Sequence, residues 1–195
     1  MKLVLASASP RRAEILRNAG FAFEVRPSNI DEARLTGERA DDYVRRLANG
    51  KARAVAAALG KRDEQTIVIG ADTVVVLGSQ ILGKPESLED ARWMLRSLGG
   101  RSHDVLTGLS VMPVPGGREI SHVETTRVTF GPLPEAEIAN YLSTGEPFDK
   151  AGAYGIQGIG GRYVERIEGC YFNVMGLPLS RLWRTLGEAG WTNPK

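Results

Sequence analysis

The sequence predicts an α/β protein built around a mixed β-sheet. Segments typical of strands and helices alternate through the first half of the chain, which by itself favours parallel strands. Two long apolar runs, at 105–114 and 120–130, then follow each other with only a Pro115-Gly116-Gly117 turn between them, as in an antiparallel hairpin. The hairpin favours a mixed sheet over a doubly wound parallel one. A length of 195 residues fits one domain, 1–195, and leaves two small lobes open.

The first elements follow from a short apolar run and from helix-starting residues. Residues 2–6 are typical of a buried strand. Ser9 before Pro10 is a favoured pair at a helix start, and we expect that helix to end at Gly20. Residues 21–26 predict a second strand.

A longer helix and two β-rich segments come next. Residues 41–59 form an amphipathic pattern, and Gly60 closes it. The segments 66–70 and 73–77 are rich in β-branched residues, and we expect Asp72 to lie between them at a strand end or a bulge. The apolar positions of the helix are Tyr43, Leu47, Ala48, Ala52, Val55 and Leu59.

The rest of the chain continues with mixed elements. A turn leads into a short strand at 80–82, and Ser87 caps a helix that has Asp90 at the capping-box position. The later elements are a helix at 134–142, a glycine-rich stretch at 152–161, a strand at 163–167 and a helix at 177–189.

Composition excludes several classes of protein. The 25 Lys+Arg and 23 Asp+Glu residues leave a net charge of +2, too little to hold nucleic acid by bulk electrostatics. A single cysteine, Cys170, permits no internal disulfide and no cysteine zinc site. His103 and His122 lie far apart in sequence, so a Ser-His-Asp hydrolase is weakly supported.

The chain has no pattern typical of secretion or membrane insertion. Its first residues contain no long apolar stretch and meet two arginines early, unlike a signal peptide. The longest apolar run, 66–77, is interrupted by Asp72 and falls short of the roughly 18 residues that span a bilayer. We therefore expect a soluble, cytoplasmic protein.

The first candidate site is the segment SASPRR. Arg11 and Arg12 lie on the first turn of the predicted helix, where the helix dipole disfavours positive charge. Two arginines, two serines and free helix N–H groups together suit an anion. A solvated basic turn with Ser9 as its cap explains the same residues equally well.

Acidic and basic residues elsewhere give weaker signals. Asp72 either makes an Asx-type turn, the commoner outcome, or points into a site at the sheet edge. Lys51 lies within a helix and Lys84 follows an apolar strand, and either alone could be solvated. The pair Asp31-Glu32 lies in a loop.

Extra glycine indicates loops where backbone passes close to another group. Glycine accounts for 23 of the 195 residues, and five glycines fall between Gly152 and Gly161. The stretch matches neither a Walker A loop nor G-x-G-x-x-G. It is either a flexible loop or backbone held close to a ligand, with Gln157 able to make paired amide hydrogen bonds. The candidate residues point in one direction. Arginines and lysines suit a polyphosphate, carboxylates suit a hard divalent cation, and a Gln in a glycine-rich loop suits the edge of a base.

These residues, taken in order, resemble the Maf family of nucleoside triphosphate pyrophosphatases, a group once described as septum-formation inhibitors. The resemblance covers nearly the whole chain. Its motifs are S-x-SPRR at Ser7–Arg12, Asp31-Glu32, R-L-A-x-x-K-A at Arg46–Ala52, G-A-D-T at Gly70–Thr73, ILGKP at Ile81–Pro85, GEPFDKAGAYGIQG at Gly145–Gly158 and GLPL at Gly176–Leu179.

The resemblance implies a fold and an activity. The fold is a two-lobed, mixed α/β, inosine triphosphatase-like arrangement around a central cleft, usually in a homodimer. The activity is hydrolysis of a nucleoside triphosphate to the monophosphate and pyrophosphate with a divalent metal cation (Mg²⁺, Mn²⁺ or Co²⁺). A role in cleaning the nucleotide pool or in division arrest would follow.

The resemblance also implies residue roles in catalysis. Asp72 would accept the proton of the attacking water, and Glu32 would hold the metal, with Asp72 able to ligate it as well. Lys51 and Lys84 would neutralise the triphosphate together with Arg12.

Other residues would bind the substrate and select its base. Ser7 would lie close to the triphosphate, beside Arg12. Arg11, Thr73 and Gln157 match the subfamily that acts on dTTP and UTP. A Gln amide can pair with the imide edge of uracil or thymine. These bases differ by one methyl, worth only about 1–3 kcal/mol, so both should be accepted.

Two alternatives stay open beside this prediction. A related subfamily prefers 7-methyl-GTP and has Trp in place of the first Arg and Glu in place of the Gln, so Arg11 and Gln157 argue against it. The chain could instead be a nucleotide-binding regulator of septation whose hydrolysis is incidental.

Overall fold

The computed structural model describes residues 1–59 and 65–192, and these residues fall into two compact units. The first unit contains Met1–Asp72, Thr107–Glu124 and Gly176–Lys195; the second contains Thr73–Leu106 and Thr125–Met175. Gly60, predicted to close a helix, lies outside the described residues.

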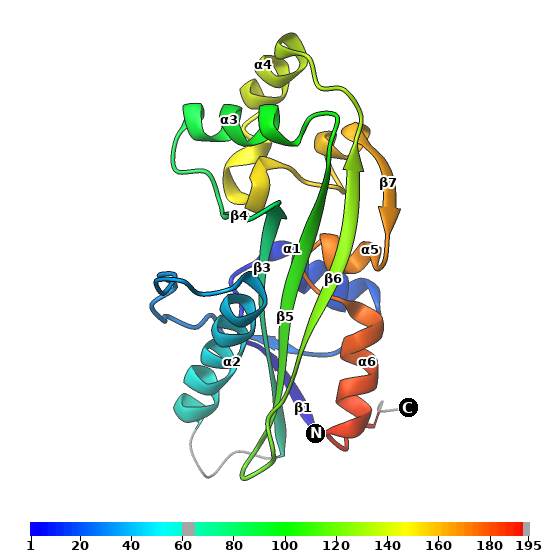
Figure 1. The fold of residues 1–195 in the computed structure, drawn as a ribbon. Helices are drawn as coiled ribbons and strands as arrows, with labels where there is room; N and C mark the ends of the chain where they lie inside the picture. The colour runs from blue at the N-terminus through cyan, green and yellow to red at the C-terminus, as the bar shows by residue number, and fades with distance from the viewer. Residues whose placement is uncertain (60–64, 193–195) are drawn as a thin grey trace. The chain divides into compact units, whose positions relative to one another are not determined.

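A seven-stranded sheet has the order β2-β1-β3-β5-β6-β7, with β4 paired to β3 (Figure 1). Strand β1 (Lys2–Leu5) is parallel to both β2 (Glu24–Val25) and β3 (Thr66–Leu77). Strand β4 (Gln80–Leu82) turns back antiparallel to β3. The sheet therefore contains both strand directions, which confirms the predicted mixed α/β class.

The predicted hairpin lies next to β3, on the side away from β1. Strands β5 (Ser102–Val114) and β6 (Ile120–Phe130) are neighbours joined only by residues 115–119. A connection this short permits only antiparallel pairing. Strand β7 (Val164–Glu168) adds antiparallel to β6.

Strand β3 corrects one prediction. The sequence predicted two strand segments separated at Asp72, but β3 runs without a break from Thr66 to Leu77. Asp72 is only 8% exposed and its carboxylate is bonded to Lys51, so its charge is satisfied inside the strand. A buried polar side chain that finds a partner needs no turn or bulge.

The helices begin close to where the sequence predicted. The Oγ atom of Ser87 accepts the N–H of Asp90 at 3.0 Å, as expected of a cap, while the Asp90 carboxylate accepts the N–H of Glu86. Ser9 is at the predicted N-cap position, but its side chain makes no cap hydrogen bond. The helices are α1 (Pro10–Asn18), α2 (Ala40–Leu59), α3 (Leu88–Leu98), α4 (Glu135–Ser143), α5 (Tyr171–Val174) and α6 (Leu179–Glu188).

Residues 146–163, which include the glycine-rich stretch 152–161, contain three short 3₁₀ turns. They are η1 (Glu146–Asp149), η2 (Ala151–Ala153) and η3 (Ile159–Tyr163). The short helix α5 was not anticipated. Within the described ranges, every helix falls short of the length or the apolar character that crossing a bilayer requires.

Helix α2 packs on β3 and β5 through two glycines (Figure 1). A Cβ atom on Gly70 would overlap the carbonyl oxygen of Ala48 and lie 2.9 Å from the nitrogen of Ala52. A Cβ atom on Gly108 would overlap the carbonyl oxygen of Val44. The sequence placed the extra glycines in loops, but these two lie within strands, where a helix backbone leaves no room for a side chain.

The first unit also contains an aromatic cluster beside α6. The ring centroids of Phe21 and Trp191 are 5.4 Å apart, and those of Trp183 and Trp191 are 5.8 Å apart. Trp191 is 7% exposed, whereas Trp183 is 52% exposed. The cluster joins the chain after α1 to the end of α6.

The core of the second unit encloses His103. Its Nε2 atom lies 2.9 Å from the hydroxyl of Tyr154, and its ring stacks edge-on against Phe130 at 5.1 Å between centroids. Burial lowers the pKa of His103 to about 4, an effect only partly opposed by Asp104. The ring is therefore neutral in the folded protein at neutral pH.

We expect the stability of the protein to fall as the pH drops from 6.5 to 4. In that window unfolded His103, with an ordinary pKa near 6.5, binds a proton that the folded ring does not. The cost approaches about 3 kcal/mol. Denaturant unfolding across this range should show the stability gap between wild type and His103→Gln narrowing with acidity. If the free energies of unfolding of the two proteins changed with pH in parallel, the prediction would be contradicted.

Candidate active site

A buried lysine joins two acidic residues in the first unit. Nζ of Lys51, on α2, lies 2.7 Å from Oδ1 of Asp72 on β3 and 2.8 Å from Oε1 of Glu32. The side chains of Lys51 and Asp72 are 9% and 12% exposed, while that of Glu32 is 55% exposed. The group is therefore buried at one end and open to solvent at the other. The Asx-type turn considered for Asp72 does not form.

The close packing of α2 on β3 explains why Lys51 reaches Asp72. Ala48 and Ala52 are the residues that contact Gly70, and Lys51 follows on the same stretch of helix. Gly70 precedes Asp72 by two residues, so their side-chain positions share one face of the strand. Because Gly70 has no side chain, α2 lies close enough to β3 for Lys51 to reach the carboxylate of Asp72.

Arg12 and Ser7 form a second polar group in the same unit. The guanidinium of Arg12 donates from Nη1 to Oγ of Ser7 at 2.9 Å and from Nε to the carbonyl oxygen of Gly176 at 2.8 Å. The N–H of Ser9 also donates to Oγ of Ser7. Arg12 is 8% exposed, so the solvated basic turn is wrong for this residue. Arg11, beside it, stays partly exposed.

Electrostatics connect the two groups. Burial lowers the pKa of Arg12, and the nearby charge of Asp72 opposes this, with a smaller contribution from Glu32. Burial also raises the pKa of Tyr43, and the charges of Asp72 and Glu32 raise it further. The arginine, the tyrosine and both acidic residues therefore lie within one electrostatic neighbourhood.

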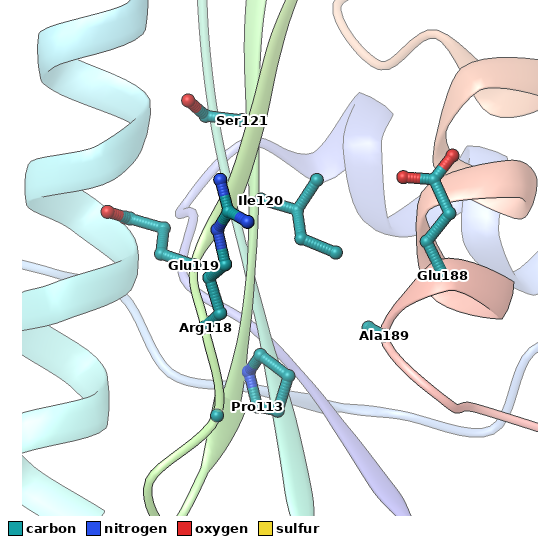
Figure 2. Close-up of a pocket in the computed structure, with 8 residues that line it drawn as sticks. Pro113, Arg118, Glu119, Ile120, Ser121, Glu188 and Ala189 are labelled. Atoms are coloured by element: carbon teal, nitrogen blue, oxygen red, sulfur yellow. The ribbon is translucent and has the colours of Figure 1, made fainter.

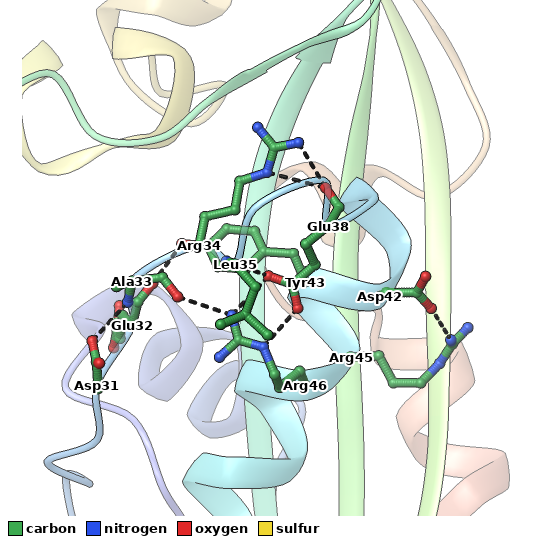
Figure 3. Close-up of polar contacts among 10 residues, drawn as sticks. All are labelled: Asp31, Glu32, Ala33, Arg34, Leu35, Glu38, Asp42, Tyr43, Arg45 and Arg46. Carbon is green, nitrogen blue, oxygen red and sulfur yellow. Dashed lines mark hydrogen bonds and ion pairs between the residues drawn. The ribbon is translucent and has the colours of Figure 1, made fainter.

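The loop that bears Glu32 is held against α2 by a clamp (Figure 3). Arg46 donates to both carboxylate oxygens of Glu38, at 2.6 and 2.8 Å, and to the carbonyl oxygen of Ala33 at 3.0 Å. The hydroxyl of Tyr43 donates to the carbonyl oxygen of Glu32 at 2.9 Å. Bidentate pairing fixes the guanidinium plane as well as its distance. The clamp thus sets where the Glu32 backbone lies.

The two residues of the acidic pair, Asp31 and Glu32, make different contacts. Asp31 accepts the N–H of Ala33 at 2.9 Å in a local turn, while Glu32 reaches Lys51. Sequence reasoning missed the clamp, although Arg46 lies inside a quoted motif. Tyr43 was assigned to the apolar helix face, and nothing in the pattern showed that its hydroxyl would bond the loop.

Thr73, Lys84 and Gln157 belong to the second unit. Thr73 directly follows Asp72 on β3, and Lys84 is exposed between β4 and α3. The carbonyl oxygen of Gly83 accepts the N–H of Gly152 at 2.9 Å, which ties the Lys84 segment to the start of the glycine-rich stretch. Gln157 is exposed within that stretch.

The carboxylates suit a hard divalent cation that is also bound by phosphate. Among residues 1–59 and 65–192, no three His, Cys, Asp or Glu side chains gather closely enough to hold a metal ion alone. Mg²⁺ typically binds through one or two carboxylates plus substrate phosphates. Glu32 and Asp72, bonded to the same ammonium group, fit that arrangement.

A separate pocket of about 680 Å³ contains none of the predicted site residues (Figure 2). It lies in the first unit, where the β5–β6 connection faces the end of α6. It is lined by Pro113, Gly117, Arg118, Glu119, Ile120, Ser121, Glu188 and Ala189.

A family model described as Maf-like protein matches residues 2–189. A dTTP/UTP pyrophosphatase of Koribacter versatilis is 50% identical over 97% of this chain and 95% of its own. A dTTP/UTP pyrophosphatase of Carboxydothermus hydrogenoformans is 47% identical over 98% of this chain and all of its own. Among solved structures, the Ham1 protein of Staphylococcus aureus matches 84% of this chain and 80% of its own, with 18% identity and a TM-score of 0.49.

Proposed function

Because this chain belongs to the Maf-like protein family, we propose that it is a nucleoside triphosphate pyrophosphatase that hydrolyses dTTP and UTP to the monophosphate and pyrophosphate. The relatives of Koribacter and Carboxydothermus, with about half of their residues identical over nearly the whole length, support this substrate class. The observation that carries the proposal is Lys51, buried between Asp72 and Glu32. Such a cluster supplies cationic charge, carboxylates and a proton acceptor in one place.

Hydrolysis needs an acceptor for the proton of the attacking water. Oδ1 of Asp72 is bonded to Lys51, which holds the carboxylate in place and leaves Oδ2 to take that proton. As the water oxygen bonds to the α-phosphorus, the bond from that phosphorus to the bridging oxygen breaks and pyrophosphate leaves. Arg12, Lys51 and Lys84 neutralise the triphosphate, and Ser7 orients Arg12 through its hydroxyl.

A divalent cation completes the proposed chemistry. Glu32 and Asp72 would hold it, and Mg²⁺, Mn²⁺ or Co²⁺ would each suit oxygen ligands. When bound, the cation screens the negative charge of the phosphates and of the leaving pyrophosphate. Lys51 is bonded to both carboxylates and would keep these two ligands close together.

The base would be selected by three residues. Gln157 would pair its side-chain amide with the imide edge of uracil or thymine, and Arg11 and Thr73 complete the set that distinguishes the dTTP/UTP subfamily. The proposed setting is the cytoplasm, where the enzyme would act as a homodimer in nucleotide-pool cleaning. These assignments come from the family resemblance.

The direct test is product analysis with a panel of nucleotides. The purified protein is incubated with dTTP, UTP, CTP and 7-methyl-GTP in Mg²⁺ or Mn²⁺, and the products are separated. We expect monophosphate and pyrophosphate from dTTP and UTP. Preference for 7-methyl-GTP would overturn the roles of Arg11 and Gln157, and no turnover of any nucleotide would overturn the proposed activity.

The clamp on the Glu32 loop gives a further prediction. Arg46→Met removes both hydrogen bonds to Glu38 and the one to Ala33, so the loop no longer fixes Glu32 beside Lys51. We expect the Mg²⁺ concentration at half-maximal activity to rise about tenfold, as for other groups that orient metal ligands.

The neighbouring arginine provides a matched control. Arg45 lies on the same helix and makes an exposed ion pair with Asp42 (Figure 3). Arg45→Met should leave the Mg²⁺ dependence unchanged. An equal shift in both variants would show that the effect reflects lost positive charge and not the clamp.

A further inference from the structure

The glycine-rich loop of the second unit wraps around the carboxylate of Glu146. Oε2 of Glu146 accepts the N–H of Ile159 at 2.8 Å, and Oε1 accepts the N–H of Gly160 at 3.1 Å. Oε1 also accepts the hydroxyl of Tyr141 at 2.8 Å. A carboxylate that accepts several backbone N–H groups binds the loop strongly. Although burial acts to raise it, the pKa of Glu146 is lowered by these hydrogen bonds.

The loop has two arms, one at Gly155 and one at Ile159 and Gly160. Glu146 anchors the second arm, and Tyr141 anchors the first. Its hydroxyl accepts the N–H of Gly155 at 3.1 Å while it donates to Glu146. The Tyr141 ring is fully buried, so this hydroxyl has a fixed position. Both arms of the loop are therefore bonded to one tyrosine–glutamate pair.

The glycines allow this close approach. A Cβ atom on Gly158 would lie 2.6 Å from Oε1 of Glu146, and one on Gly160 would lie 2.5 Å from the hydroxyl oxygen of Tyr141. A Cβ atom on Gly155 would lie 2.6 Å from Cε of Lys150. The sequence left two interpretations of these glycines open, a flexible loop or backbone held close to a ligand. The structure shows that this backbone lies close to side chains of the protein itself.

Gln157 lies between the two anchored arms. The N–H of Gly158 donates to the carbonyl oxygen of Gly155 at 3.3 Å, closing a turn that contains Gln157. The side chain of Gln157 is exposed. Its backbone is thus held on both sides while its amide is open to solvent.

We propose that Glu146 is a positioning residue that sets base selectivity through Gln157 without touching the nucleotide. The inference rests on the proposed function and adds a specificity-determining residue to it. A held turn keeps the Gln157 backbone in one place, so pairing of its amide with a pyrimidine imide costs little loop entropy. The carboxylate of Glu146 bonds to Tyr141 and to the glycine-rich loop, and not to Asp72, Lys51 or Glu32. Its loss should therefore weaken base binding while the phosphoryl chemistry continues.

The test is a double-mutant cycle with Glu146→Gln and Gln157→Ala. In Glu146→Gln, the amide N–H₂ must face the N–H of either Ile159 or Gly160, so one of the two hydrogen bonds that hold this part of the loop is lost. We expect the KM for UTP to rise about tenfold with kcat changed less than about twofold, because the lost interaction is equal in ground and transition states. In the Gln157→Ala background, Glu146→Gln should change KM by less than about twofold.

Controls separate positioning from general damage. Glu168→Gln, which alters an exposed ion pair with Arg166 in the same unit, should leave KM unchanged. Tyr141→Phe removes the shared hydroxyl and should raise KM as Glu146→Gln does, which tests the inference even if one variant fails to fold. Hydrogen exchange should show the N–H groups of Ile159 and Gly160 both protected in wild type, and at least one of them less protected in Glu146→Gln.

The outcomes distinguish two failures. Wild-type protein that does not hydrolyse UTP would overturn the proposed function and this inference with it. Wild-type hydrolysis with an unaltered KM in Glu146→Gln, or with additive effects in the double variant, would overturn the inference alone. A fall in kcat at constant KM would place Glu146 in the chemistry and would also overturn it.

Discussion

Asp72→Asn is expected to fold normally and to hydrolyse dTTP and UTP about a thousandfold more slowly than wild type. The asparagine oxygen can still accept the hydrogen bond from Lys51, so the packing of α2 on β3 is kept. What is lost is the negative charge that accepts the proton of the attacking water. General base catalysis of this kind contributes about 10²–10⁴-fold. The measurement is the steady-state rate of pyrophosphate release.

A matched substitution tests whether the effect belongs to this carboxylate. Asp104 forms a half-exposed ion pair with Arg127 and is outside the proposed site. Asp104→Asn should keep the wild-type rate, and thermal unfolding should confirm that both variants are folded. A folded Asp72→Asn protein that retains more than about a tenth of the wild-type activity would remove Asp72 from the role of base.

Gly108→Ala is expected to destabilise the protein by about 3 kcal/mol or more. The new Cβ atom would overlap the carbonyl oxygen of Val44 and lie 2.9 Å from the nitrogen of Arg45, both backbone atoms of α2 that no rotamer change can move aside. Overpacking a core typically costs about 1–3 kcal/mol, and a clash with backbone belongs at the upper end or beyond. For a chain of this length the melting temperature should fall by roughly 6–12 °C.

Gly187→Ala provides a control of opposite sign. Gly187 lies in α6, and a Cβ atom there would meet nothing within 4 Å. Alanine in a helix is favoured over glycine by about 0.5–1 kcal/mol, so this variant should melt slightly above wild type. If Gly108→Ala and Gly187→Ala lost the same stability, the effect at Gly108 would not come from the close packing of α2.

Much of the fold could be predicted because its elements depend on local patterns. The β5–β6 hairpin followed from two apolar runs around a turn, and α3 followed from Ser87 at its start. The break expected in β3 was wrong because the pattern showed a charge at Asp72 but could not show its partner, Lys51, 21 residues away. Likewise, Gly70 and Gly108 look like weak strand residues until α2 is placed on them.

The candidate site was predicted through motifs more than through geometry. The structure brings Lys51, Asp72 and Glu32 together, and it pairs Ser7 with Arg12. Their joint use of one nucleotide stays a proposal. Two supporting residues escaped prediction because they act on backbone atoms: Tyr43 on a carbonyl of the Glu32 loop, and Glu146 on N–H groups of the Gln157 loop. Backbone targets leave no complementary residue type in the sequence.

The aromatic cluster beside α6 gives the protein built-in spectroscopic reporters. The chain has three tryptophans: Trp183 and Trp191 belong to the first unit, and Trp93 belongs to the second. In a Trp93→Phe protein, indole fluorescence arises only from the first unit, where buried Trp191 packs against Phe21. In a protein with phenylalanine at 183 and 191, it arises only from the second. The two signals would reveal whether the units unfold together or in succession.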